Sequence, residues 1–345
     1  MNFIKEKLNL IINAYKKNML SHAYLISGDL YGGQKLLADE IAKFLMCESE
    51  NKTEEGICNT CKMCNLFNAQ THPDIHYVRP DDDKTVISIE KVRQIIESAN
   101  KKPYYGKKSI YIIEEIAGMN VAGHNSMLKI LEEPPEHVLF LLTTSKKHII
   151  LDTILSRVIT VELSCYAEDP EAFFSENGDE IIEKQEFLRK TLYLPEIINY
   201  GLIAGQKDEL KDFYVKKAES IEGTFNLYNL LNTKKMTREE LIYIRTLFVT
   251  FYLDLIFSID DITLKISAIS DFEYVYNDLS VDKASRNEIF VFFLKYLRMM
   301  LRNKQHSNII EKVFYIIEKI LGYENYYSSI NFFDIFKLTL CELED

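Results

Sequence analysis

Four cysteines form the most specific chemical pattern in the sequence. Their spacing is C-x10-C-x2-C-x2-C, and they are Cys47, Cys58, Cys61 and Cys64. Four thiolates complete the tetrahedral shell of a Zn²⁺ ion and leave no open position, so the pattern predicts a structural zinc site. An iron–sulfur cluster is the alternative, because C-x2-C-x2-C also occurs in ferredoxins. Cys64 is followed by Asn65–Asn68 with no nearby Cys-Pro, which favours zinc.

A glycine-bearing turn is the second candidate site. A working phosphate loop reads G-x-x-x-x-G-K-[ST], with the lysine on the outer phosphates and the hydroxyl on Mg²⁺. Counted from Gly28 to Gly33, Gln34 takes the lysine place and Lys35 the hydroxyl place. A shift of one residue makes Lys35 the phosphate lysine but puts Leu36 at the metal-ligand place. Neither register supplies the hydroxyl, so we expect no hydrolysis. A simple tight turn between strand and helix is the alternative.

Two carboxylates end an apolar β-like run, Ser109–Ile113, and they are Glu114 and Glu115. This arrangement places a metal-coordinating acid and a water-activating acid beside a phosphate loop. Glu114 stands where aspartate is usual, so a tightly defined magnesium geometry is not expected. The alternative is an ordinary buried strand that ends at solvent.

These residues need a scaffold of alternating strands and helices, which the first 160 or so residues predict. The β-like runs are Ala23–Ile26, Ser109–Ile113, Val138–Thr143 and Val158–Leu163, and helical patterns cover Lys35–Met46 and Asn125–Leu131. Such alternation implies a parallel sheet covered on both faces. From Ala167 onward the apolar residues recur at helical spacing,. The expected class is therefore α/β followed by all-α.

Length and charge limit the possible functions. A chain of 345 residues fits two or three domains,. Its net charge of −11 argues against a protein that coats DNA with its whole surface,. The apolar stretches Leu247–Phe257 and Ile289–Leu301 contain charged residues and are shorter than the ~20 residues of a spanning helix, so they are predicted core helices,. The start reads as an amphipathic helix rather than a signal peptide, so a cytoplasmic protein is expected.

Further motifs carry a family resemblance. In chain order they are His22-Ala23-Tyr24, His72-Pro73-Asp74, Asn125–Pro135, Phe140–Ser145 and Ser156-Arg157-Val158. Over about residues 20–163 the chain resembles the AAA+ modules of bacterial DNA polymerase III clamp loaders. The resemblance implies an AAA+ P-loop-like domain at 1–164 with an inserted zinc module at about 47–64. A helical lid domain at 165–205 and a helical collar domain for oligomerisation at 206–345 would follow.

The resemblance also implies roles for single residues. Arg157 corresponds to an arginine that relatives project into the ATP site of the neighbouring subunit, although Val158 replaces the cysteine usual in that element. A trans-acting arginine needs no nucleotide in its own site. Thr144 lies near the sensor position that touches the outer phosphate in active relatives, and beside a degenerate loop we expect it to be structural. Related loader subunits carry a comparable zinc module.

Three functions remain open from the sequence. The first is a non-hydrolysing subunit of a hetero-oligomeric clamp-loader ring, which helps to load the sliding clamp onto primed DNA and supplies Arg157 to a neighbour. The backbone N–H groups of Gly28–Gly33 could hold an anion by themselves, so the chain could bind nucleotide without hydrolysing it. The second is an ATP-hydrolysing motor subunit or another AAA+ ATPase that uses Lys35. The third is a zinc-dependent nucleic-acid-binding protein, which the acidic charge disfavours.

Overall fold

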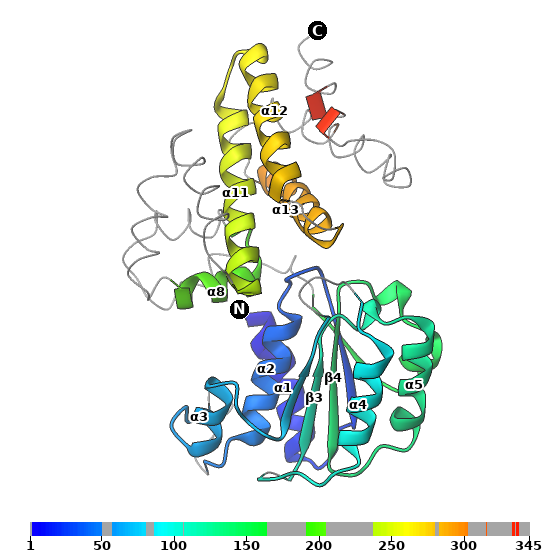
Figure 1. The fold of residues 1–345 in the computed structure, drawn as a ribbon. Helices are drawn as coiled ribbons and strands as arrows, with labels where there is room; N and C mark the ends of the chain where they lie inside the picture. The colour runs from blue at the N-terminus through cyan, green and yellow to red at the C-terminus, as the bar shows by residue number, and fades with distance from the viewer. Residues whose placement is uncertain are drawn as a thin grey trace. The chain divides into compact units, whose positions relative to one another are not determined.

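The computed structural model describes residues 2–49, 57–80, 86–105, 107–163, 191–204, 237–279 and 283–302, with positions 315, 333–334 and 336–337 (Figure 1). The chain divides into two compact units. The first comprises Met1–Asn177 and Leu194–Glu196, and the second comprises Gly178–Tyr193 and Ile197–Asp345. The predicted three-domain division has its joints at 164–165 and 205–206, which lie outside the described residues, so it stays a prediction.

The first unit is built on a five-stranded parallel sheet with the strand order β2-β3-β4-β1-β5. The strands are β1 (Ala23–Ser27), β2 (Ile75–Val78), β3 (Ser109–Ile113), β4 (Val138–Thr144) and β5 (Ile159–Glu162). Four of them follow the β-like runs of the sequence, and β2 was not expected. The parallel sheet with its helices confirms the predicted α/β class for this part of the chain.

Helices cover both faces of the sheet (Figure 1). The helices of this unit are α1 (Asn2–Lys16), α2 (Gln34–Met46), α3 (Lys62–Asn68), α4 (Ile89–Ala99), α5 (Val121–Glu132) and α6 (Asp152–Leu155), with 3-10 turns at Ile116–Gly118 and Lys147–Ile149. Helices α1 to α3 share one core cluster and α4 to α6 the other. Successive strand residues alternate between the two clusters: Leu139 and Leu141 join the first, whereas Phe140 and Leu142 join the second,. All residues of β1, β3 and β4 are buried, as a sheet covered on both faces requires,.

Helices α4 and α5 begin with side-chain caps, whereas α2 does not. The side chain of Ser88 accepts a hydrogen bond from Lys91 N (3.3 Å) at the start of α4, and Asn120 accepts one from Gly123 N (2.8 Å) at the start of α5,. Helix α2 begins after Gly33, which has no side chain to cap it. Its first N–H groups therefore need partners from elsewhere.

The described part of the second unit is helical. Its helices are α8 (Pro195–Ala204, whose first two residues belong to the first unit), α11 (Arg238–Ser258), α12 (Ile262–Leu279) and α13 (Lys283–Arg302). Stacked aromatic rings such as Tyr252 and Phe272, 5.1 Å apart, join α11 to α12. Helix α11 is longer than the predicted apolar run, and by length and composition it is able to cross a membrane. However, 72% of its most apolar window is buried inside the protein, which is typical of a core helix.

Candidate functional site

The glycine-bearing loop, the acids after β3 and Thr144 gather at one edge of the sheet. Parallel strands end at the same edge, and ligands of open α/β sheets bind outside these carboxyl ends. The loop follows β1, Glu114 and Glu115 follow β3, and Thr144 is the last residue of β4. A backbone hydrogen bond from Gly28 N to Thr144 O (3.2 Å) joins the loop to β4. We call this set the loop edge.

Two glycines give the loop its backbone shape. Gly33 has φ +100° and ψ 9° and immediately precedes Gln34, the first residue of α2. A Cβ at Gly33 would lie 2.7 Å from Cδ1 of Ile4, and one at Gly28 would lie 2.8 Å from the carbonyl oxygen of Leu163. The positive φ at Gly33 and the close backbone approach at Gly28 both favour glycine.

The side chain of Gln34 is turned back onto the loop and β4. It is buried, and its Nε2 donates to the carbonyl oxygen of Asp29 (2.7 Å) and to that of Thr144 (3.4 Å). Its Oε1 is buried and has no hydrogen-bond partner among the described residues. An amide in this position therefore brings no positive charge to the loop, and its buried oxygen is an acceptor that repels another anion.

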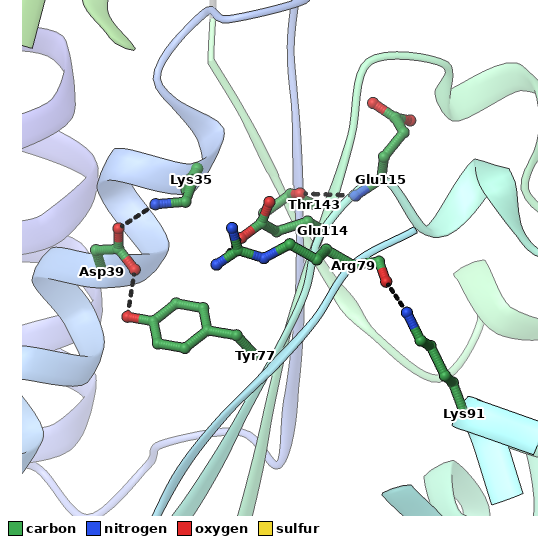
Figure 2. Close-up of polar contacts among 8 residues, drawn as sticks. All are labelled: Lys35, Asp39, Tyr77, Arg79, Lys91, Glu114, Glu115 and Thr143. Atoms are coloured by element: carbon green, nitrogen blue, oxygen red, sulfur yellow. Dashed lines mark hydrogen bonds and ion pairs between the residues drawn. The ribbon is translucent and has the colours of Figure 1, made fainter. Parts of the chain in front are cut away.

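Lys35 forms an ion pair along its own helix. Its Nζ lies 3.1 Å from Oδ2 of Asp39, one turn further along α2, and the hydroxyl of Tyr77 donates to Oδ1 of the same carboxylate (2.9 Å). Figure 2 shows Lys35 and Tyr77 approaching Asp39 from α2 and β2. Burial alone would lower the pKa of Lys35, but the negative charges of Asp39, Glu114 and Glu196 raise it overall,. Lys35 is therefore charged and neutralised within the domain.

Glu114 faces a cation from the neighbouring strand. The guanidinium of Arg79, the residue after β2, lies 3.7 Å from Oε1 of Glu114, and the Arg79 carbonyl accepts a hydrogen bond from Lys91 Nζ (3.0 Å; Figure 2). A metal-coordinating acid would have to give up this partner to bind Mg²⁺. The Arg79–Glu114 contact therefore adds to the missing hydroxyl as a feature unfavourable for a magnesium site.

The carboxylate of Glu115 is held by the end of β4. Thr144 Oγ1 donates to Glu115 Oε1 (2.8 Å), and Ser145 N donates to both carboxylate oxygens (3.1 and 3.0 Å). The Glu115 backbone is left-handed, with φ 50°, and its N–H donates to Thr143 Oγ1 (3.1 Å). Glu115 and Thr144 thus engage each other and join β3 to β4.

Glu196, at the start of α8, also reaches the loop edge. Its Oε1 accepts a hydrogen bond from the backbone N–H of Lys35 (3.0 Å), in the first turn of α2. Burial raises the pKa of Glu196 to about 7; Lys35 opposes this shift, whereas Glu114 and Asp39 add to it,. The missing cap of α2 is therefore supplied by a residue 161 positions further along the chain.

The four cysteines come together beside α3. Their Sγ atoms all lie within 4.8 Å of one another, with Cys47–Cys58 at 3.6 Å and Cys58–Cys64 at 3.9 Å. Tetrahedral Zn–S bonds of about 2.3 Å imply sulfur separations of about 3.8 Å, so the cluster fits such an ion. Backbone N–H groups of Thr60 and Cys61 lower the pKa of Cys58 to about 6, whereas burial raises the pKa of Cys64,. The four residues are thus able to bind a metal.

Arg157 lies at the opposite edge of the sheet from the loop. It stands two residues before β5, whereas the loop follows the carboxyl end of β1, the parallel neighbour of β5. Five residues of β1 separate these edges by roughly 15 Å. The guanidinium contacts Thr153 O (2.6 Å) and Glu132 Oε1 (2.5 Å). It borders an open cavity of about 620 Å³, which is lined by His22, Leu131, Glu132, Ser156, Arg157, Val158 and Ile159. We call this set the arginine edge.

Asp39, Arg79 and Glu196 are loop-edge residues that the sequence reasoning missed. Asp39 follows Lys35 at the i,i+4 spacing of a helical ion pair, which is a usable signal,. Arg79 follows a four-residue strand that was not expected. Glu196 follows Pro195 as in any ordinary helix start, and nothing in that pattern indicates a contact with a distant loop.

The strand order, the glycine loop after β1 and the acids after β3 define the class of the first unit, an α/β domain that fits the AAA+ fold. The comparisons agree with this class. A crystal structure of a DNA polymerase III gamma subunit-related protein from Thermotoga maritima has the same fold, with a TM-score of 0.55 and 19% identity over 98% of this chain and 97% of that chain.

Comparison with known sequences shows which protein family the chain resembles. Residues 4–166 match the family described as DNA polymerase III, delta subunit. The chain is 30% identical to DNA polymerase III subunit delta' of Bacillus subtilis over 230 residues, 66% of this chain and 65% of that relative. It is 33% identical to subunit tau/gamma of Haemophilus influenzae over 162 residues, 47% of this chain and 23% of that relative. The chain thus spans less than two thirds of the length of these relatives. Residues 4–166 therefore resemble the DNA polymerase III delta-subunit family, and the chain is similar to the subunits delta' and gamma/tau of DNA polymerase III.

Proposed function

We propose that the chain is a non-hydrolysing subunit of a DNA polymerase III clamp loader. In this role it joins other subunits in a hetero-oligomeric ring in the cytoplasm and helps to load the sliding clamp onto primed DNA. One observation carries the proposal: the charged groups at the loop edge are engaged within the domain, whereas Arg157 is accessible at the opposite edge. The similarity to subunit delta' supports it.

Arg157 would then act on a neighbour rather than on its own loop. The separation of roughly 15 Å between the two edges keeps it away from the loop of its own chain. Its guanidinium would stabilise negative charge that develops on a phosphate transferred in the adjacent subunit. Exchange of the exposed Glu132 for a phosphate costs little, because surface ion pairs contribute only about 0–1 kcal/mol,.

The second candidate is an ATP-hydrolysing motor subunit. The 33% sequence identity with subunit tau/gamma of Haemophilus influenzae favours this candidate. The loop edge argues against it, because Gln34 brings no charge and Lys35 is paired with Asp39. Hydrolysis of ATP by the isolated chain would select this candidate.

We also propose that the four cysteines hold one structural Zn²⁺ ion. Their mutual distances and the N–H groups directed at the sulfurs support this assignment. Metal analysis of protein prepared without chelator is expected to find about one equivalent of zinc and no iron. Iron in place of zinc would assign the iron–sulfur alternative.

A clamp-loading assay tests the proposed function. A reconstituted clamp loader and labelled sliding clamp are incubated with ATP and primed circular DNA, and the DNA-bound clamp is counted. We expect loading to need this chain and to fall strongly with Arg157→Ala but not with Arg93→Ala, which removes an exposed arginine on α4. Full loading in the absence of the chain would contradict the proposal.

A further inference from the structure

The first turn of α2 already binds an anion, and that anion is part of the chain. Helix N-termini bind phosphates because their N–H groups are unpaired and the helix dipole is positive there. At α2 the Lys35 N–H donates to the Glu196 carboxylate at 3.0 Å. The helix has no side-chain cap of its own, since Gly33 precedes it. Glu196 therefore fills the role that a phosphate oxygen has at a working loop.

The surroundings of this carboxylate are unfavourable for a second anion. Asp39 and Glu114 lie near enough to act on the ionisation of Glu196, and Lys35 is paired with Asp39. The loop interior offers no cation, because Gln34 occupies the lysine place and is bonded to loop carbonyl oxygens. A triphosphate would have to displace the Glu196 carboxyl group and would then meet two carboxylates that already hold the nearby cations Lys35 and Arg79.

We infer that Glu196 closes the loop: its carboxyl group takes the place of a nucleotide phosphate at the N-terminus of α2. This inference rests on the proposed non-hydrolysing function and deepens it, because it names the group that excludes the nucleotide. Loss of the catalytic residues alone would leave a loop able to bind nucleotide without turnover. With Glu196 bound at the start of α2, the loop is also unable to bind nucleotide without turnover.

Calorimetric titration of the full chain at pH 8, where Glu196 is ionised, with inorganic tripolyphosphate and with magnesium ATP tests the inference. The variants are Glu196→Ala, which removes both the charge and the acceptor, and Glu196→Gln, which removes the charge and keeps an acceptor for Lys35 N–H. The matched control is Glu90→Ala, which removes an exposed acid from the first turn of α4 on the other face of the sheet.

We expect Glu196→Ala to bind tripolyphosphate at least about tenfold more tightly than the unaltered chain and the Glu90→Ala control, with Glu196→Gln in between. Equal affinity in all four proteins would overturn the inference. If Glu196→Ala does not fold, as judged by circular dichroism, the test depends on Glu196→Gln. Tripolyphosphate affinity of Glu196→Gln equal to that of the unaltered chain would then overturn the inference. ATP turnover by the unaltered chain would instead refute the proposed function, so the two failures are distinguishable.

Discussion

The loop edge and the arginine edge belong to the same sheet but differ in how their charges are partnered. At the loop edge, buried or half-buried groups engage one another in the pairs Lys35–Asp39, Arg79–Glu114, Thr144–Glu115 and Lys35 N–H with Glu196. At the arginine edge, the side chain of Arg157 is 31% exposed, much as Lys35 (29%) and Arg79 (30%) are at the loop edge. The carboxylates differ: Glu132 is 49% exposed, against 20% for Asp39 and 16% for Glu114. The first arrangement engages its charges within the domain, and the second leaves a cation within reach of another molecule.

The difference matters because the two kinds of pair respond differently to a competing phosphate. Separation of a pair whose carboxylate is largely buried leaves that charge poorly solvated, so it costs more than separation of a pair with an exposed carboxylate. Separation of an exposed pair costs at most about 1 kcal/mol, because water solvates both partners. A phosphate from outside therefore competes well for Arg157 and poorly for the groups of the loop edge.

The largest effect at the loop edge that we expect to be independent of pH follows distortion of its backbone. Gly33→Ala places a Cβ on a residue with φ +100°, so we predict a loss of about 2 kcal/mol in the free energy of unfolding,. Urea denaturation measures it. Gly123→Ala, within α5, is the control and is expected to change stability by less than about 1 kcal/mol,. An equal loss in both variants would show that the positive φ is not the cause.

A second effect on stability, which depends on pH, follows neutralisation of Glu196. Its pKa in the folded chain is about 7 against an ordinary value of 4.5, so the folded state binds the proton more tightly than the unfolded state,. The stability contributed by this group is present below pH 4.5 and is lost as the pH rises to about 7. Glu196→Gln is therefore expected to gain roughly 1–2 kcal/mol over the unaltered chain between pH 5 and pH 6, and about 3 kcal/mol above pH 7,. A difference that does not change with pH would show that Glu196 carries no buried charge.

Thr144→Val tests whether the Thr144 hydroxyl has a structural role at the loop edge. It removes the hydroxyl that donates to Glu115 (2.8 Å), and a loss of about 1 kcal/mol in stability is predicted,. Because the hydroxyl is engaged within the domain, we expect ATP hydrolysis by the reconstituted loader to stay unchanged. Thr160→Val, on β5, serves as the control. A large loss of hydrolysis with normal stability would make Thr144 a phosphate sensor after all.

The smallest effect on stability is expected for the partner of Arg157 at the arginine edge. Glu132→Ala removes an exposed partner of Arg157, so the expected change in stability is below about 0.5 kcal/mol,. Hydrolysis by the loader is predicted to stay within about twofold of the unaltered rate. A tenfold fall would show that Glu132 positions Arg157 for its neighbour, and the arginine edge would then be as preorganised as the loop edge.

The sequence predicted the central strands of the sheet well but did not predict the edge strand β2. Apolar runs place β1, β3 and β4 within one residue at each end, because strands buried on both faces are continuously apolar,. Strand β2 has only four residues, and His76 and Tyr77 interrupt its apolar pattern. Short half-buried strands give no comparable signal.

The candidate site was predictable where it depends on local pattern. The gathering of Gln34, Glu114 and Thr144 at one edge follows from the parallel strands that carry them. The contact of Glu196 with Lys35 joins residues 161 positions apart, so only the folded chain reveals it. The proposed role of Arg157 rests on a family resemblance, and its position at the opposite edge is consistent with that role.

The rate of ATP hydrolysis by the reconstituted loader, stimulated by clamp and primed DNA, tests the contrast between the two edges most directly. It is measured with the unaltered chain, with Arg157→Ala and with Arg93→Ala, beside the isolated chain. We predict no turnover by the isolated chain, equal rates with the unaltered chain and Arg93→Ala, and at least about a tenfold fall with Arg157→Ala, because a trans-acting arginine is worth about 10³–10⁵ at the site that it serves. Turnover by the isolated chain, or an unchanged rate with Arg157→Ala, would contradict the proposal.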